Sequence, residues 1–311
     1  MFNRFRRAPH NQQLLGMVQV TDGWSAALIE RDGSRCHLRW AAHSPHAPGS
    51  TLPSSLARRD ARGIKCTSLL TSADYSLILV DALEVPPAEL RAAVRWRVNE
   101  MIDFHVDDAV IDIFDVPATD GRTNRLYAVA ARAAAVRRIG AELTEAGFKL
   151  DSIDIPELAL RNIAATLPED QAGVAMVVLE ETRGVVTLTR QGNLYLSRRL
   201  DYGTERLLGT DPSADAPLNE GALDTLVIEI QRSLDYYERH FAQPAIHGIV
   251  FAPTAQPLGT AGAYLQSQLG LTVRVLDLNE VVSTDAPLDS TLQAQCLTAI
   301  GAAMRTEEIS L

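Results

Sequence analysis

The feature that most constrains how this chain folds is an order of short strand-like segments that occurs twice. Apolar or alternating segments rich in β-forming residues follow one another at 14–20, 24–30 and 35–41. Asp22-Gly23 and Asp32-Gly33 fall between them, and Asp-Gly between such segments is a strong β-hairpin signal. Three similar segments with two short turns return at 174–200. No residue identity links the two regions, so the repeated order itself predicts two similar lobes, each opening with a three-stranded antiparallel meander.

The remaining segments indicate an insert in the first lobe and a long helix in the second. A helix that begins at Pro86-Pro87 and two further strand candidates predict a small α/β insert at about 75–148. Apolar residues spaced by three or four predict a long amphipathic helix at about 219–241. The polar segment 167–173 marks the boundary between lobes. We therefore expect a flexible basic N-terminus (1–13), a first lobe (14–171), a second lobe (172–290) and a C-terminal helix returning to the first lobe (291–311).

Composition limits the classes of function that are open to the chain. It has 311 residues, 46% of them apolar, and a formal net charge of −10. This balance is ordinary for a folded protein and argues against nucleic-acid binding through broad charge neutralisation. The basic N-terminal residues are not followed by the apolar run of a secretory signal. The three cysteines are far apart and odd in number, which predicts a reducing, cytoplasmic location rather than a disulfide framework or zinc site.

The usual nucleotide-binding motifs are missing from the sequence. It contains no P-loop, no G-x-G-x-x-G and no G-x-S-x-G. The two-lobed layout offers another solution, in which the first hairpin turn of each lobe points backbone N–H groups at phosphates held between the lobes. The candidate residues for those turns are Asp22, Gly23 and Ser25 in the first lobe and Glu180, Thr182 and Gly184 in the second.

Several stretches, in this order along nearly the whole chain, resemble the PilM family of type IV pilus assembly proteins. Within that family they are most similar to MshI-type proteins of mannose-sensitive haemagglutinin (MSHA) pilus systems. More distantly, they resemble the cytoplasmic part of the type II secretion protein GspL. The matching stretches are 84–94, 147–154, 158–161, 229–237 and 297–305, after an N-terminal MFNRFRR. The resemblance implies an α/β, two-lobed, actin-like ATPase (RNase H-like) fold with a small insert subdomain in the first lobe.

The departures from that family fall at the places where its ATP-binding members hold nucleotide. Trp24 is expected to stand where small residues let a phosphate approach, and Glu180-Glu181 bring negative charge to the second turn. Pro253 replaces a glycine and removes an N–H donor on the adenosine side. We therefore expect no enzymatic activity and no cofactor, only vestigial turns. The alternatives are an Mg-ATP-binding protein that would depend on Asp22, Ser25 and Thr182, and a small-molecule kinase of the same superfold.

The resemblance also implies a partner, the cytoplasmic N-terminal tail of a PilN-like inner-membrane protein, with the assembly ATPase as a further candidate. We expect the insert helix to contact the tail through Arg91, Arg95, Trp96 and Asn99, unless Trp96 packs inside the insert. The chain would then be cytoplasmic and peripheral at the inner membrane. Weak contact with an anionic membrane surface would involve residues that are otherwise read as a disordered terminus, namely Phe2, Arg4, Phe5, Arg6 and Arg7.

Overall fold

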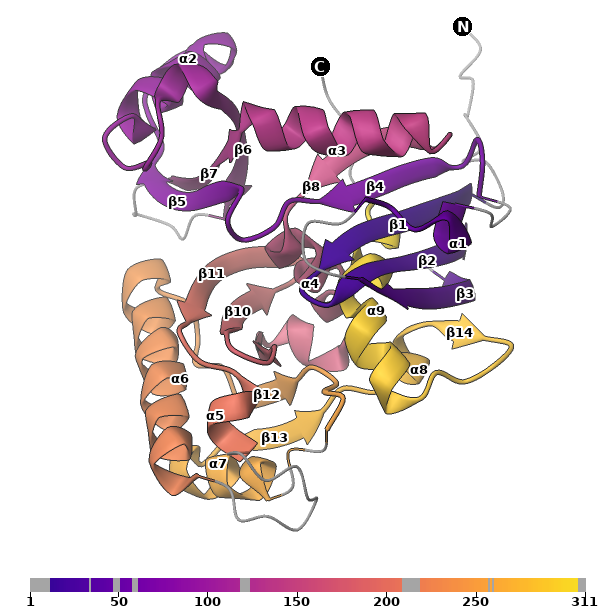
Figure 1. Ribbon diagram of the computed structural model, residues 1–311. Coiled ribbons are helices and arrows are strands. Elements are labelled where there is room, and N and C mark those ends of the chain that lie inside the picture. The colour runs from indigo at the N-terminus through magenta and orange to yellow at the C-terminus, as the bar shows by residue number, and fades with distance from the viewer. Residues whose placement is uncertain are drawn as a thin grey trace, which may run out of the picture.

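The first lobe is built on a six-stranded sheet whose strands run in the order β14-β3-β2-β1-β4-β8 (Figure 1). This computed structural model describes residues 12–33, 35–46, 51–57, 61–117, 124–208, 219–256, 258 and 260–306. The antiparallel meander predicted from the Asp-Gly turns is present, and β4 and β8 extend it in parallel. The strands are β1 (Gln12–Val20), β2 (Gly23–Asp32), β3 (Arg35–Pro45), β4 (Lys65–Leu69), β8 (Lys149–Asp154) and β14 (Ser283–Thr284).

The second lobe repeats this arrangement in a five-stranded sheet of order β11-β10-β9-β12-β13. Three antiparallel strands again come first, and β12 and β13 follow in parallel beside β9. The strands are β9 (Val174–Leu179), β10 (Gly184–Arg190), β11 (Asn193–Leu200), β12 (Gly248–Phe251) and β13 (Thr272–Val275). The helices α5 (Thr204–Leu208), α6 (Glu220–Phe241) and α7 (Ala261–Leu269) belong to this lobe. The repeated element order in the sequence thus corresponds to two sheets with one shared topology.

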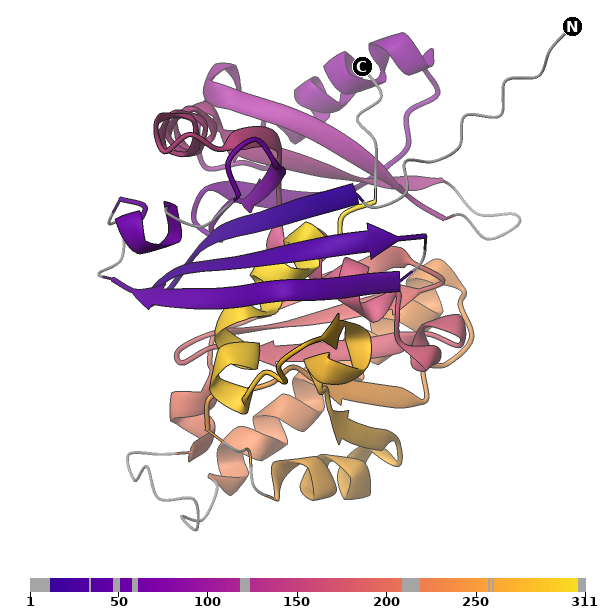
Figure 2. The same cartoon turned by 90° about the vertical axis from the view of Figure 1, so that its right-hand side faces the viewer.

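A layer of two helices joins the lobes. α4 (Pro156–Ala164) and α9 (Ser290–Ala303) pack between the two sheets, and α9 runs behind the first-lobe strands in Figure 2. Their apolar side chains share one cluster with residues of both sheets, including Ile29 and Met176. α9 approaches its neighbours at two glycines: a Cβ on Gly16 would lie 2.0 Å from the carbonyl oxygen of Ala299, and one on Gly301 would lie 2.3 Å from that of Ala159. Only glycine permits this closeness, so these two positions fix the central layer.

The insert forms a third sheet of order β5-β7-β6 at the top of the molecule in Figure 1. It comprises β5 (Tyr75–Asp81), α2 (Pro87–Val98), β6 (Ala109–Val116), β7 (Arg125–Arg132) and α3 (Ala133–Glu145). α2 covers one face of this sheet through Val94 and Val98. Residues of the insert also join the apolar cluster of the second lobe, where the Tyr127 hydroxyl donates to the carbonyl oxygen of Tyr195 at 3.1 Å. The insert therefore contacts both lobes.

The shortest elements were not expected from the sequence. These are α1 (Ser54–Ala57), η1 (Val106–Asp108), η2 (Pro168–Gln171), α5, α8 (Leu278–Val281) and β14. The prolines and the glycine between 45 and 53 would predict a loop over 43–55, but the structure is regular at both ends of that stretch. β3 runs on to Pro45 because the β2–β3 pairing continues until Gly23 faces Pro45, and α1 begins at Ser54. Elements of two to five residues are too short to show a period of their own.

Candidate functional site

The turn between β1 and β2 is bound to its own lobe through side chains. The Ser25 hydroxyl, which is fully buried, donates to the carbonyl oxygen of Gln295 in α9 at 2.6 Å. Because its proton is used there, Nδ1 of His43 donates to the Ser25 oxygen at 3.0 Å. Nε2 of the same ring lies 3.5 Å from Asp22 Oδ2. Asp22 and Ser25, two of the predicted turn residues, thus both lie beside His43, and the Ser25 hydroxyl is already occupied by contacts within the protein, whereas the Asp22 side chain is 61% exposed.

Trp24 does not stand in the phosphate position, so that expectation was wrong. Its side chain is 1% exposed and belongs to the first-lobe core with Leu15 and Met17 of β1. Successive residues of a strand point to opposite faces of the sheet. Ser25 faces α9 and the inter-lobe layer, so Trp24 must face the other way, toward the cluster that also contains Leu56 and Ile139. The obstruction in the cleft therefore comes from other residues.

The turn between β9 and β10 meets the first-lobe turn directly. The Thr21 hydroxyl donates to Glu180 Oε2 at 3.2 Å, and Arg183 forms an ion pair with the same carboxylate at 3.0 Å. The backbone of this turn is also engaged, because the carbonyl oxygen of Glu180 accepts from the Thr204 N–H at the start of α5. Thr182 lies exposed in the turn, and Gly184 begins β10, where a Cβ would lie 2.8 Å from the carbonyl oxygen of Val178. A carboxylate, rather than an open set of donors, occupies the space between the two turns.

The guanidinium of Arg183 also reaches the segment that leads into the insert. It donates to the Ser72 hydroxyl at 2.5 Å, and Arg199 of β11 donates to the Ser72 carbonyl oxygen at 3.1 Å. Ser72 lies between β4 and β5, so three parts of the molecule meet at this point. The positive charge of Arg183 is therefore shared between Glu180 and Ser72 and is directed at protein atoms.

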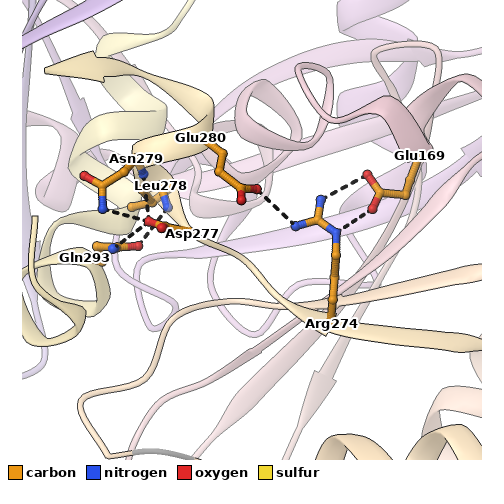
Figure 3. A network of polar contacts seen from close by, with 7 residues as sticks. All are labelled: Glu169, Arg274, Asp277, Leu278, Asn279, Glu280 and Gln293. Carbon is orange, nitrogen blue, oxygen red and sulfur yellow. Dashed lines mark hydrogen bonds and ion pairs between the residues drawn. The ribbon is translucent and has the colours of Figure 1, made fainter. Parts of the chain in front are cut away.

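A cavity of about 830 Å³ lies at the carboxyl ends of β12 and β13, where ligands commonly bind in α/β sheets. Pro253 is buried in its wall and offers no N–H. Among the described lining residues Arg274 is the only cation. Its guanidinium donates to both oxygens of Glu169, at 2.5 and 3.1 Å, and lies 3.9 Å from Glu280. Figure 3 shows these contacts as dashed lines. Hydrogen bonds from Arg274 lower the pKa of Glu169, so this carboxyl is ionised and neutralises the arginine.

The same wall carries a second carboxylate, that of Asp277. It accepts hydrogen bonds from the Asn279 backbone N–H at 2.9 Å and from the Gln293 amide at 2.8 Å (Figure 3). The backbone bond is the main cause that lowers the pKa of Asp277, which is therefore negatively charged at neutral pH. The described groups around the cavity and the two turns thus do not fit a polyphosphate, because the cations Arg274 and Arg183 are paired and the carboxylates of Asp277 and Glu180 add negative charge.

The residues predicted for partner contact lie on or at the end of α2, but two of them are paired within the insert and the other two are exposed. Arg91 forms an ion pair with Asp112 at 3.0 Å, and Arg95 forms one with Asp107 at 3.1 Å. Both arginines therefore fasten the helix to the strand β6 and the segment before it. Trp96 is 81% exposed, which decides against its packing inside the insert, and Asn99 is exposed at the end of the helix. The residues Phe2, Arg4, Phe5, Arg6 and Arg7 lie outside the described residues.

A buried carboxyl that no sequence pattern singles out lies where the lobes and the insert meet. Glu157, in the first turn of α4, is 3% exposed. It accepts from the Tyr75 hydroxyl of β5 at 2.5 Å and from the Ser197 hydroxyl of β11 at 3.5 Å. Burial raises the pKa of Glu157, and the hydrogen bond from Tyr75 opposes that rise. An acid in a first helical turn is usually explained by its favourable interaction with the helix dipole. Only the tertiary structure shows that this one is buried.

Comparison with known proteins supports the architecture. A solved structure of a PilM–PilN type IV pilus biogenesis complex is similar at a TM-score of 0.72 and 20% identity, over 93% of this chain and 97% of that one. The cytoplasmic domain of EpsL, an inner-membrane component of the type II secretion system of Vibrio cholerae, is similar at a TM-score of 0.50 and 10% identity, over 93% and 95% of the two chains. No family model and no curated protein matched the sequence. The chain has a two-lobed actin-like fold.

No described helix is both long enough and apolar enough to cross a membrane.

Proposed function

We propose that this protein is a PilM-like scaffold of a type IV pilus assembly machine, of the MshI type, which neither binds nor hydrolyses ATP. The observation that supports the lack of nucleotide binding is the pairing at the two lobe turns, where Glu180 holds Arg183 at 3.0 Å and accepts from Thr21 at 3.2 Å. In an actin-like fold these turns would cradle phosphates, and here a carboxylate and its arginine fill the interval. The paired state of Arg274 supports the same view for the adenosine side.

The partner in this proposal is the cytoplasmic N-terminal tail of a PilN-like inner-membrane protein. The likeness to a solved PilM–PilN complex over nearly the full length of both chains supports it. The protein would then be cytoplasmic and held at the inner membrane through that tail. The assembly ATPase is a further candidate partner, and the basic residues near the N-terminus would add a weak membrane contact.

Isothermal titration with Mg-ATP tests the nucleotide part of the proposal. We expect no heat of binding at protein concentrations of tens of micromolar, because no described cation in the cleft is free for phosphate. A saturable binding curve with a micromolar dissociation constant would refute it. Binding of the labelled tail of a PilN-like protein from the same organism, measured by fluorescence anisotropy, tests the partner. Co-sedimentation with anionic liposomes, with and without residues 2–7, tests the membrane contact.

A second candidate is an ATP-binding actin-like assembly protein whose partner binding depends on nucleotide. The cavity of about 830 Å³ at the carboxyl ends of β12 and β13 favours it, because that volume admits a nucleoside. One measurement distinguishes the two candidate functions: the affinity of the protein for the tail with and without Mg-ATP. An affinity that changes with nucleotide would select the second.

A further inference from the structure

One end of the first-lobe sheet carries cations that the rest of the described structure leaves unpaired. Arg35 at the start of β3, Arg62 three residues before β4 and Lys149 at the start of β8 are exposed, and none of them forms an ion pair or a hydrogen bond with a described residue. Most other described cations are held by a carboxylate or a carbonyl oxygen, as Arg39 is by Glu30. These three side chains therefore keep their charge for a contact outside the chain.

The strand pairing brings these cations together. Lys65, the first residue of β4, pairs with Lys149 in β8 on one side and with Leu14 in β1 on the other. Beyond β1, the end of β2 and the start of β3 reach the same end of the sheet, where Asp32 faces Arg35. β3 and β8 are four strand spacings apart, about 19 Å. We call this row the basic edge and define it as Arg35, Arg62, Lys65 and Lys149.

The basic edge contains the only two lysines of the chain, Lys65 and Lys149, as direct neighbours in the sheet. Like charges that face each other across two strands are unfavourable. Asp151, 3.0 Å from Lys65, neutralises one of them, and Lys149 keeps its charge. The exposed acids at this end of the sheet are Asp32 and Glu145, so the basic edge alone has only a small excess of positive charge.

The N-terminal segment adds positive charge at the same place. Residues 1–11 contain three arginines and no acid, and they lead into β1 at Gln12, in the middle of the row. Because a chain spans at most about 3.6 Å per residue, Arg7 cannot be more than about 18 Å from Gln12. Phe2 and Phe5 stand among the arginines in the sequence. The segment thus brings cations and apolar groups to the end of the sheet that already carries the basic edge.

An anionic membrane surface fits this arrangement better than a nucleic acid does. Residues 12–311 carry a formal net charge of −13, because residues 1–11 contribute +3 to the total of −10. Such a body is repelled by an anionic surface except where its cations face that surface, and this orients the molecule with the basic edge toward it. Phenylalanines beside arginines are typical of segments that lie in the headgroup region of a bilayer. Nucleic-acid binding relies on many phosphate contacts, which so acidic a body opposes.

We propose that the basic edge and the N-terminal segment together form the surface by which this protein lies against anionic lipid, with the phosphate headgroups of acidic phospholipids as the ligands. This inference rests on the proposed place of the protein at the inner membrane and adds the face that meets the lipid. Three arginines alone give only weak binding, and the basic edge extends the contact across the whole end of the sheet.

Co-sedimentation of the full chain with vesicles of phosphatidylglycerol and phosphatidylcholine in equal parts tests the proposal. We expect binding at low salt that is lost at about 0.5 M sodium chloride, where charges are screened. Each basic residue near an anionic surface strengthens binding about fivefold, so the triple variant Arg35→Gln, Arg62→Gln, Lys149→Gln should bind about 100-fold more weakly. All three side chains are exposed and unpaired in the described structure, so the melting temperature should not change.

The matched control removes the same charge elsewhere, through Arg97→Gln, Arg232→Gln and Arg239→Gln. These exposed arginines lie on α2 and α6, at the left of Figure 1, whereas the first-lobe sheet lies at the right. The control variant should bind the vesicles as the unaltered chain does. If it loses as much binding as the triple variant of the basic edge, net charge rather than this surface is responsible, and the inference is wrong.

Three other results would also overturn the inference. The first is no binding to the anionic vesicles, or equal binding to vesicles of phosphatidylcholine alone. The second is a loss of binding when residues 2–7 are deleted while the triple variant binds normally, which would assign the contact to the N-terminal segment alone. The third is tighter binding to a short DNA duplex than to the vesicles at the same salt concentration. No PilN-like tail is present in these assays, so binding of that tail in solution tests the proposed function separately.

Discussion

The buried pair Tyr75–Glu157 gives a prediction whose size can be worked out from the structure. Tyr75 is 5% exposed and Glu157 3%, and the tyrosine hydroxyl supplies the short bond to the carboxyl. The Ser197 hydroxyl lies 3.5 Å from the second oxygen, which is a weak contact, and the backbone of Glu157 and the charge of Arg199 favour the ionised carboxyl less than Tyr75 does. Tyr75→Phe therefore leaves a buried carboxyl oxygen without its main partner. Leaving a buried donor or acceptor without its partner costs about 1–3 kcal/mol, so we expect a loss of about 2 kcal/mol at pH 7.5.

The matched control is Tyr127→Phe in the same insert. Its hydroxyl is also buried, but it donates to an uncharged backbone carbonyl at 3.1 Å. The expected loss is about 1 kcal/mol, the usual net value for a neutral hydrogen bond. Urea unfolding followed by circular dichroism measures both free energies. Equal losses for the two variants would refute the view that the Tyr75 hydroxyl is the main partner of the buried Glu157 carboxyl.

The pH dependence provides an independent check on the same pair. Burial raises the pKa of Glu157 above its ordinary value of 4.5. Between pH 4.5 and the raised pKa, the folded state therefore keeps a proton that the unfolded state has lost. Stability therefore falls as pH rises through this window. The Tyr75 bond lowers the pKa, and its removal makes that fall larger, so the cost of Tyr75→Phe should grow from pH 4 to pH 7.5. Glu157→Gln should abolish this part of the pH dependence.

Two other features give shorter predictions. Arg274→Gln should cost about 1 kcal/mol at pH 7.5 because the partly exposed pair with Glu169 is lost. Since Arg274 lowers the pKa of Glu169, that stabilisation is fully present above the ordinary carboxyl pKa of 4.5 and is lost as pH falls through the lower, folded value, so the cost of the substitution should shrink as the pH is lowered below 4.5. Gly301→Ala should destabilise the chain by about 1–3 kcal/mol or prevent folding, because a Cβ would press on backbone. Gly262→Ala, where the nearest atom is 3.8 Å away, should leave the melting temperature unchanged or raise it.

The elements that could be predicted from the sequence have either an apolar pattern repeated over many residues or a clear turn signal at their ends. The helix expected at about 219–241 is found at Glu220–Phe241, because six apolar residues spaced by three or four define one face. The meanders followed from Asp-Gly and similar turns, and their repetition gave the two lobes. α8 and β14 were not predicted, because elements of four and two residues are too short to show a repeating apolar pattern.

The candidate site was less predictable because its contacts join distant residues. Thr21 and Glu180 are 159 positions apart, and no local pattern links them. Trp24 was misplaced because the sequence locates a residue along a strand but does not say which of the two sheet faces lies toward the cleft. The burial of Glu157 likewise depends on β5 and β11, which precede and follow it by dozens of residues.

The strength of the contacts between the turns bears on what keeps nucleotide out. Thr21, Glu180 and Arg183 are substantially exposed, and exposed pairs of this kind contribute at most about 1 kcal/mol. Such contacts could open, whereas the apolar layer of α4 and α9 holds the lobes together in any case. The barrier to phosphate is therefore the lack of free donors and cations more than the closure itself. It follows that Glu180→Ser alone should not confer Mg-ATP binding in a titration, because Arg274 remains neutralised by Glu169 and Pro253 still lacks an N–H. If that single substitution produced micromolar binding, the phosphate cradle would be intact behind one blocking side chain, and the protein would be a masked nucleotide binder.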